Sequence, residues 1–383
     1  MIYIHIPYCR SFCTYCDFYS EVASRCSTYE GFAKALSSEI AARKCEIENN
    51  ILSPSGVNTL YIGGGTPSVL PLSVFESVLS SLKSVGCKGD FDEFTVEVNP
   101  EDIVEKGHGY VEGLLKLGVN RISMGVQSFD DETLKWMNRR HDSARAKQAY
   151  AILEEAGVEN ISIDLIFGLP QLSLEGWKEN LSKALSISPS GVLPSHISSY
   201  QLSVEEGSAL ASLMAKGKWS EASDEVCALQ YETLCETLRE AGYHHYEISN
   251  FAQPGYEARH NSAYWNHTPY IGLGPGAHSY IPDSRKWNNP DLMAYIEAGK
   301  TGDFSAVSGG EILTAEQLGL ERLMLGLRTS KGLSVDFLEG FCAKESIRKV
   351  LDEGHLQLLD NGFFRIPEEH FFISDAIITD LSL

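Results

Sequence analysis

Short runs of β-branched and aromatic residues alternate with longer helical patterns over the first 205 residues of the chain. The short runs predict strands at residues 2–6, 57–62, 93–98, 120–126, 160–166 and 196–202. The longer patterns predict helices near residues 28–48, 71–84, 108–117, 143–156 and 174–187. Strands that alternate with helices form βαβ units around a parallel sheet. Six strands in this order fit either a doubly wound sheet or an incomplete barrel.

Polar and glycine-rich segments follow the C-terminal ends of these strands, and their position favours the barrel. PYC follows the first strand, GGGTPS the second and NPE the third, while Gln127, Gly168 and Gln201 lie at or just after the next three. A β/α barrel builds its active site on that rim. We therefore expect an α/β fold with an incomplete (β/α)6 barrel over residues 1–205.

The pattern changes after residue 205. A long helix is predicted near residues 223–241, and a loop-rich stretch follows, so residues 206–310 form a predicted extension of the barrel. Residues 311–383 combine short helices with a hairpin around LQLLDNGFFRI, in which Asn361-Gly362 is a strong turn signal. We expect this part to be a small C-terminal α+β domain resembling a winged helix.

Charge and composition exclude several functions. The formal net charge of -21 argues against nonspecific nucleic-acid binding, which needs a basic face. No apolar run reaches the roughly 18 residues of a membrane span, and the N-terminus lacks an export signal. We therefore expect a cytoplasmic protein whose nine cysteines stay reduced, so that clustered thiols indicate a metal or redox site.

Three cysteines are clustered after the first strand. Cys9, Cys13 and Cys16 are spaced C-x3-C-x2-C, and thiolates suit iron–sulfur clusters or zinc. Structural zinc usually takes four ligands, whereas three thiolates can hold three irons of a cubane cluster and leave the fourth iron open. We expect the remaining cysteines to be small core residues, at positions 26, 45, 87, 227, 235 and 342.

The cluster loop YIHIPYCRSFCTYCDFYS resembles that of the radical S-adenosylmethionine (SAM) superfamily, specifically its coproporphyrinogen III oxidase branch. The resemblance continues in order through GGGTPS, EVNPE, RISMGVQSF, DLIFGLP and GLGPGAHS. It implies a [4Fe-4S] cluster on the three cysteines, with SAM chelating the open iron through its amino and carboxylate groups. An electron from a donor such as flavodoxin or ferredoxin would then split the sulfonium and release a 5′-deoxyadenosyl radical.

The resemblance also implies a set of SAM contacts. Glycines after a strand let the backbone approach a ligand closely, although the same run could be a structural turn. A carboxylate within an apolar strand is costly without a partner, which favours function, whereas a cation at a helix end is ordinary. The expected SAM residues are Tyr3, Tyr15, Gly64, Gly65, Thr66, Glu97, Gln127, Arg139 and Asp164. Whether one or two SAM molecules bind stays open.

A second motif, HNSAYW, lies in the loop-rich extension. It resembles the HNxxYW signature of the heme chaperones called HemW, which are related to the oxidases. Imidazole is a common heme ligand and aromatic rings can flank a porphyrin, although a lone histidine is more often structural. The resemblance implies heme binding at His260, Asn261, Tyr264 and Trp265.

Two departures from the oxidase pattern favour the chaperone. The oxidases carry a further cysteine two residues after the third ligand, where this chain has Phe18, and they extend ahead of the barrel, whereas the first strand here begins almost at Met1. We therefore expect a heme chaperone that passes heme to an acceptor protein. This function is compatible with peripheral association with membrane heme proteins. The alternatives are an oxygen-independent coproporphyrinogen III oxidase, which converts two propionates to vinyl groups, and another radical SAM reaction.

Overall fold

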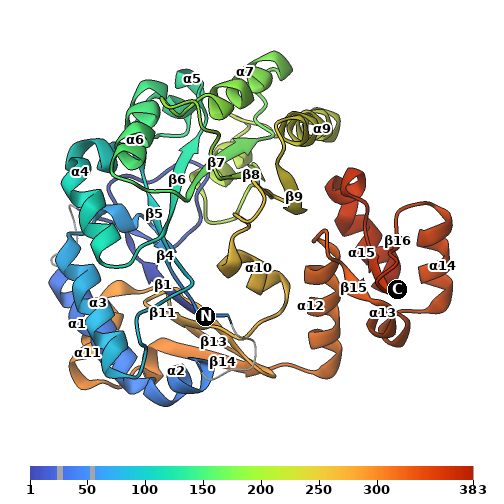
Figure 1. The fold of residues 1–383 in the computed structure, drawn as a ribbon. Helices are drawn as coiled ribbons and strands as arrows, with labels where there is room; N and C mark the ends of the chain where they lie inside the picture. The colour runs from blue at the N-terminus through green and yellow to red at the C-terminus, as the bar shows by residue number, and fades with distance from the viewer. Residues whose placement is uncertain (24–28, 52–56, 383) are drawn as a thin grey trace.

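The structure, a computed structural model, describes residues 1–23, 29–51 and 57–382, and a curved sheet of nine strands dominates it (Figure 1). The strand order is β11-β1-β4-β5-β6-β7-β8-β10-β9, and the seven strands from β11 to β8 run parallel. The strands are β1 Ile2–Ile6, β4 Thr59–Gly64, β5 Glu93–Val98, β6 Arg121–Gln127, β7 Ile161–Phe167, β8 His196–Gln201, β9 His244–Glu247, β10 Asn250–Ala252 and β11 Ile271–Leu273. The six strands predicted first are confirmed, and the sheet is an open barrel, as expected.

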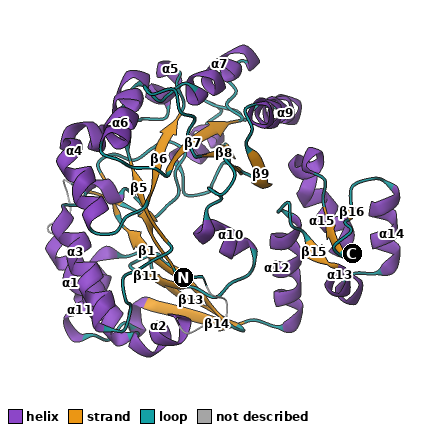
Figure 2. Cartoon of the chain, in the orientation of Figure 1, coloured by secondary structure: helices purple, strands orange, loops and turns teal. Residues whose placement is uncertain are grey.

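Helices cover the convex side of this sheet (Figure 2). They are α1 Tyr29–Ala42, α2 Lys44–Ile51, α3 Leu72–Ser84, α4 Pro100–Lys116, α5 Asp131–Trp136, α6 Ser143–Glu155, α7 Leu174–Leu185 and α9 Asp224–Glu240. The helix predicted at 28–48 is two helices, and residue 28 lies outside the described residues. The helix predicted at 108–117 begins at Pro100, which follows the N-cap Asn99, and Gly107 interrupts it with a φ of 67°. A proline fits the first turn of a helix because its missing N–H would have no partner there.

The strands alternate between apolar and polar side chains, and this alternation creates the two faces of the sheet. Ile2, Ile4, Leu60, Val96 and Ile163 are buried in the hydrophobic core. The residues between them point to the concave side, because successive side chains of a strand point to opposite faces. They are mostly polar, so the interior of this open barrel is built to hold polar groups rather than to be packed.

The predicted loop-rich extension contributes to the same sheet. β11 pairs in parallel with β1, and β10 pairs antiparallel with β8. These strands have only three or four residues, too few for a clear alternation of polarity, which is why the sequence pattern missed them. A second sheet follows, made of β12 His278–Ile281, β13 Ser284–Asn288 and β14 Ser308–Ile312.

Helix α10, Arg259–Trp265, carries the HNSAYW motif and lies on the concave side of the curved sheet (Figure 1). It packs against β4 of the sheet and against α12, Ala315–Leu327, of the C-terminal part. The motif that was predicted to lie in a loop is therefore helical, and it occupies the open side of the barrel. A helix at this place can close the barrel interior without adding a strand.

The C-terminal part is the expected small α+β domain. Its three-stranded sheet has the order β15-β17-β16, with β15 Leu333–Ser334, β16 Gln357–Leu358 and β17 Phe363–Arg365. β16 and β17 form the predicted hairpin, and Gly362 in its turn has a φ of 78°. Helices α13 Val335–Phe341, α14 Lys344–Asp352 and α15 Ser374–Ser382 complete it. Within the described ranges, none of the helices has the length and apolar character needed to cross a membrane.

Candidate functional site

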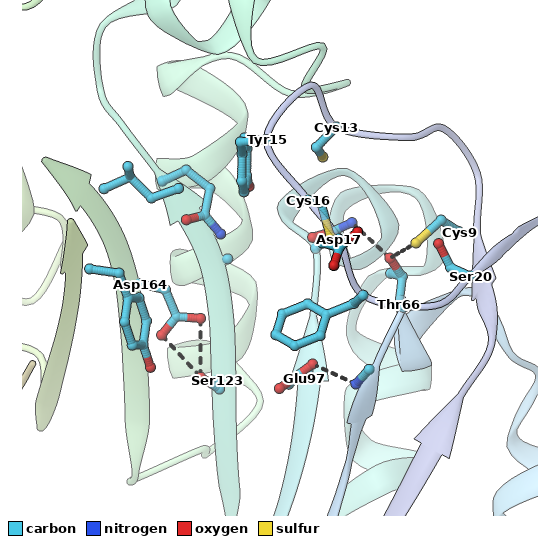
Figure 3. A pocket seen from close by; sticks show the side chains of 18 of the residues that line it. Cys9, Cys13, Tyr15, Cys16, Asp17, Ser20, Thr66, Glu97, Ser123 and Asp164 are labelled. Carbon is cyan, nitrogen blue, oxygen red and sulfur yellow. Dashed lines mark hydrogen bonds between the residues drawn. The ribbon is translucent and has the colours of Figure 1, made fainter. Parts of the chain in front are cut away.

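One cavity of about 1360 Å³ brings the candidate residues together. It opens at the C-terminal ends of the strands and continues along the concave face of the sheet. All the residues expected to hold the cluster, SAM or heme line it except Trp265. In Figure 3, the cysteines lie on a loop above the strand ends, and Glu97 and Asp164 face the same space from two strands.

The three cysteines follow β1 and are all part-buried, with Cys9 at the end of the short strand β2, Tyr8–Cys9, and the other two in the loop after it. Cys9 Sγ lies 3.4 Å from Thr66 Oγ1, and Arg139 Nη1 donates to Cys13 Sγ over 3.5 Å. Burial raises the pKa of the Cys16 thiol to about 11 and raises that of Cys9 as well. Thiols in this setting ionise only when a positive charge compensates them, and bound iron supplies that charge.

The number of thiols fits a cubane cluster with one open iron. Among the residues that the structure describes, no three His, Cys, Asp or Glu side chains converge as they would around one metal ion. In a cubane cluster each thiolate binds a different iron, so the sulfurs need to surround the cluster rather than meet at a point. The three thiols come from one short segment, and all three line the same cavity.

The other cysteines are mostly where the sequence predicts them. Cys87, Cys227 and Cys342 are buried and Cys235 is part-buried. Cys45 is exposed on α2, so the expectation of a core residue is wrong there, because a lone cysteine carries no signal for its side of a helix. Cys26 lies outside the described residues.

The GGGTP segment packs tightly against the cluster loop. The N–H groups of Gly65 and Thr66 donate to the carbonyls of Ile6 and Tyr8 over 2.8 and 2.7 Å. A Cβ on Gly65 would lie 2.6 Å from the Tyr8 carbonyl oxygen, so only glycine fits there. This close contact explains why position 65 is a glycine, independently of its expected contact with SAM. It also places Thr66 next to Cys9.

Two buried carboxylates on the concave face accept hydrogen bonds from neighbouring residues. Glu97 accepts from the Tyr61 hydroxyl over 2.6 Å and from the Gly64 N–H over 3.1 Å, and burial raises its pKa to about 7. Asp164 accepts from Ser123 over 3.2 Å, and burial raises its pKa to about 6. Both groups face the cavity, where an ammonium or a ribose hydroxyl of a ligand would stabilise the ionised form.

The end of β6 combines a strained residue with a buried cation. Gln127 has a φ of 68°, in the left-handed region, and the pairing of β6 with β7 shifts register between Gly125 and Gln127. Arg139 donates to Asn99 Oδ1 and to the Gly125 carbonyl, each over 2.7 Å, while its Nε has no partner in the part of the chain that the structure describes. Strain and unpartnered donors at one place are typical of ligand sites. Cys9, Cys13, Cys16, Gln127 and Arg139 mark what we call the cluster end of the cavity.

The HNSAYW motif forms hydrogen bonds with the first residues of β4 and β5, at the ends of the strands that lie opposite the cysteine loop. His260 Nδ1 lies 2.8 Å from Thr59 Oγ1, and Nε2 lies 3.0 Å from the Tyr264 hydroxyl. Glu93 accepts from the N–H groups of Arg259 and His260 over 2.7 and 2.9 Å. His260 is only 1% exposed, and burial lowers its pKa to about 3.

Both ring nitrogens of His260 are therefore already engaged in this conformation. The imidazole can bind iron only after it gives up one of its two hydroxyl partners. Asn261 donates to Glu247 Oε1 over 3.2 Å and so ties the same helix to β9. Tyr3 lies on β1, and its hydroxyl is 3.0 Å from His5 Nδ1. We call the region around Thr59, Glu93, His260 and Tyr264 the α10 end of the cavity.

Several cavity residues were missed by the sequence analysis. Their signal is the alternation within each strand, since they occupy the polar positions of strands whose other positions are apolar. Register places them next to predicted site residues, as with Glu97 beside Ser123 and Asp164 beside Ser198. The missed lining residues include Tyr61, Asn99, Arg121, Ser123, His196 and Ser198.

Comparison with known proteins gives concordant matches. Residues 3–184 match the family model of the radical SAM superfamily. The chain is 32% identical over 373 residues to the heme chaperone HemW of Lactococcus lactis subsp. lactis, covering 97% of this chain and 93% of that one. It is 35% identical over 337 residues to the heme chaperone HemW of Bacillus subtilis, covering 87% and 84%. The solved coproporphyrinogen III oxidase HemN from Escherichia coli, a radical SAM enzyme, matches 100% of this chain and 89% of its own with a TM-score of 0.77 at 21% identity.

Proposed function

Since the chain belongs to the HemW heme chaperone family of the radical SAM superfamily, we propose that it binds heme in the cavity of its open barrel and passes it to an acceptor protein. The observation that carries the proposal is the similarity to heme chaperones over nearly the whole chain. The cavity supports it, because one continuous space of about 1360 Å³ joins the cysteine loop to the HNSAYW helix.

The cysteine loop is the proposed home of a [4Fe-4S] cluster. Cys9, Cys13 and Cys16 are its ligands, and Arg139 offsets the negative charge of the thiolates by its contact with Cys13. When bound, the cluster supplies an open iron for the amino and carboxylate groups of SAM and an electron for its sulfonium. An electron donor such as flavodoxin or ferredoxin belongs to the same proposal.

SAM would lie between the GGGTP segment and the strand ends. Glu97 accepts hydrogen bonds in this space and would orient the ammonium, while Gly64, Gly65 and Thr66 let the backbone approach the ligand. Asp164, Gln127 and Arg139 offer a carboxylate, an amide and a guanidinium for the rest of SAM or for a second molecule. Tyr3 and Tyr15 add aromatic walls to the same cavity.

Heme would lie against α10. Tyr264, His260 and Asn261 line the cavity there, and Trp265 on the same helix would act from outside the lining. Phe18 at the cavity mouth is 71% exposed and offers a flat apolar face. Its phenyl ring has no acid–base or redox chemistry to replace the cysteine that the oxidases carry there, which is why we favour binding of a finished macrocycle over turnover.

One anaerobic sample tests the proposal. Protein reconstituted with iron and sulfide should carry about four irons per chain, bind heme in a one-to-one ratio and leave coproporphyrinogen III unchanged. Heme is titrated by its Soret absorbance, and turnover is followed by the appearance of protoporphyrinogen. Robust protoporphyrinogen production would make the protein an oxidase. Failure to bind heme with the cluster present would overturn the chaperone function.

A further inference from the structure

Arg121 is a buried arginine whose side chain has no hydrogen-bond or ion-pair partner among the residues that the structure describes. It is the first residue of β6, its side chain is 3% exposed, and it lines the cavity. Within the described part of the chain, its guanidinium makes neither a hydrogen bond nor an ion pair, and its buried Nε has no partner. An arginine carries five N–H donors in a planar fork, so an unused buried fork is unusual.

The positive charge of Arg121 shifts the pKa of residues on several neighbouring elements. It opposes the burial-driven rise in the pKa of Glu97 and of Asp164, and it adds to burial in lowering the pKa of His196 and His260. Among the described residues, none of these four side chains forms a hydrogen bond or ion pair with Arg121. Since burying a charge is costly unless it is paired, the site has a strong preference for an anion that reaches the guanidinium directly.

Arg121 lies at the same end of the sheet as the HNSAYW helix. Thr59, which contacts His260, pairs with Glu93, which holds the N–H groups of α10, and these are the first residues of β4 and β5. On the next strand, Arg121 pairs with Thr95. A ligand that touches α10 therefore reaches Arg121 across neighbouring strand ends.

We propose that Arg121 binds a carboxylate of the heme, one of its propionates, at the α10 end of the cavity. The inference rests on the proposed function and adds to it the group that anchors and orients the macrocycle. Guanidinium and carboxylate match as a two-pronged pair, which gives direction as well as affinity. The apolar rim of the macrocycle would then point away from Arg121.

The carboxylate of SAM is the other source of the same chemistry, and position disfavours it. Six residues separate Arg121 from Gln127 at the cluster end, which corresponds to roughly 20 Å along the strand. The methionine part of SAM is expected beside the cysteines, where Arg139 already contacts Cys13. Arg121 is thus too deep to reach that carboxylate while the amino acid lies at the iron.

Esterification of the ligand tests the proposal in the unmodified protein. Reconstituted wild type is titrated with heme and with heme dimethyl ester, whose propionates carry no charge. We expect heme to bind at least about tenfold more tightly, the range measured for hydrogen bonds to charged groups. Equal affinity for the two ligands overturns the role of Arg121 while leaving heme binding intact, whereas no binding of either overturns the proposed function itself.

Substitutions then assign the preference to this side chain. Arg121→Met should bind heme and its ester about equally, and Arg121→Lys should keep part of the preference, because an ammonium pairs with a carboxylate at one point only. Arg145→Met removes the same charge from an exposed position on α6 and should retain the full preference. Iron content and SAM affinity should stay at the wild-type level in all three variants.

Three results would contradict the assignment. If Arg121→Met lowers the affinity for heme and for its ester by the same factor, the preference for heme is retained. Arg121 then supports the fold and does not bind the propionate. If SAM affinity falls and the heme preference stays, the guanidinium serves the SAM carboxylate. If Arg145→Met loses the preference as well, the effect is one of overall charge.

Discussion

The two ends of the cavity differ in how far their polar groups are satisfied. At the cluster end, Gln127 adopts a left-handed backbone and Arg139 keeps an unpartnered Nε beside the thiols. At the α10 end, both ring nitrogens of His260 and the first N–H groups of the helix have partners within the protein. Within the described residues, the cluster end thus keeps an unpaired donor, while the polar groups of the α10 end pair mostly with one another.

The difference bears on the meaning of the HNSAYW motif. An imidazole binds a metal through its unprotonated nitrogen only if the lone pair there is free, and both ring nitrogens of His260, the donor and the acceptor, are engaged with hydroxyl groups. The motif then serves first to hold α10 against β4 and β5, and a direct bond to heme iron requires Tyr264 or Thr59 to be displaced. Arg121 is an exception at this end, since among the residues that the structure describes its Nε, like that of Arg139, has no hydrogen-bond partner.

The largest expected effect comes from the cysteines. Replacing Cys9, Cys13 or Cys16 by alanine should abolish the cluster, because each thiolate holds a different iron. Iron and sulfide analysis after anaerobic reconstitution measures this. Replacing Cys227 or Cys342 should leave about four irons per chain. Loss of iron from the Cys342→Ala protein, with the loop variants unaffected, would move the cluster elsewhere.

The next prediction tests whether His260 holds helix α10 against the sheet. His260→Ala should lower the free energy of unfolding of the ligand-free protein by about 2–4 kcal/mol, because it buries the hydroxyls of Thr59 and Tyr264 without a partner and leaves a hole. Denaturant unfolding measures it, with His244→Ala on the exposed edge of β9 as the control. An unchanged stability together with a loss of heme binding would instead identify His260 as a heme ligand.

A smaller effect follows from the raised pKa of Glu97. Burial raises that pKa from 4.5 to about 7, so the folded protein keeps the proton longer than the unfolded chain. Stability should therefore fall as the pH rises from about 4.5 to about 7, and Glu97→Gln should remove this part of the fall. Unfolding at pH 5 and pH 8 measures it, and Glu112→Gln on the surface of α4 should behave as wild type.

Glu97→Gln also separates binding from folding. It should weaken SAM binding while sparing the iron content, since the ammonium loses a carboxylate partner. SAM affinity is read from the change that SAM causes in the EPR spectrum of the reduced cluster. An unchanged affinity would remove Glu97 from the SAM site.

The sequence predicted the sheet better than the site. Strands with continuous or alternating apolar patterns were found within two residues of their ends, and the expected radical SAM barrel with its C-terminal α+β domain is confirmed. Short strands such as β11 were missed, because pairing with β1 defines them rather than their own pattern. The motifs predicted cluster and SAM candidates that the fold brings to one cavity. They could not show that His260 has two partners, or that the Arg121 side chain has none among the described residues. Those facts depend on register between strands far apart in the chain.

The smallest effect concerns the strain at Gln127. A glutamine with a φ of 68° costs about 1 kcal/mol or more, which glycine at the same place would relieve. Gln127→Gly should therefore raise the free energy of unfolding of the ligand-free protein by about 1 kcal/mol and at the same time weaken SAM binding, because the amide is lost from the cavity.

Asp283→Gly provides the matched control for Gln127. Asp283 has a φ of 65° in the exposed turn between β12 and β13, and it does not line the cavity. This variant should gain less stability than Gln127→Gly, because aspartate tolerates the left-handed region better than glutamine, and it should keep the wild-type affinity for SAM. If both variants gain stability and both keep SAM affinity, the strain at Gln127 serves only the bend of β6, and the cluster end would differ less from the α10 end than its geometry indicates. If only Gln127→Gly loses affinity, the left-handed residue at the end of β6 is tied to ligand binding, because the two residues share a backbone conformation and only Gln127 lines the cavity.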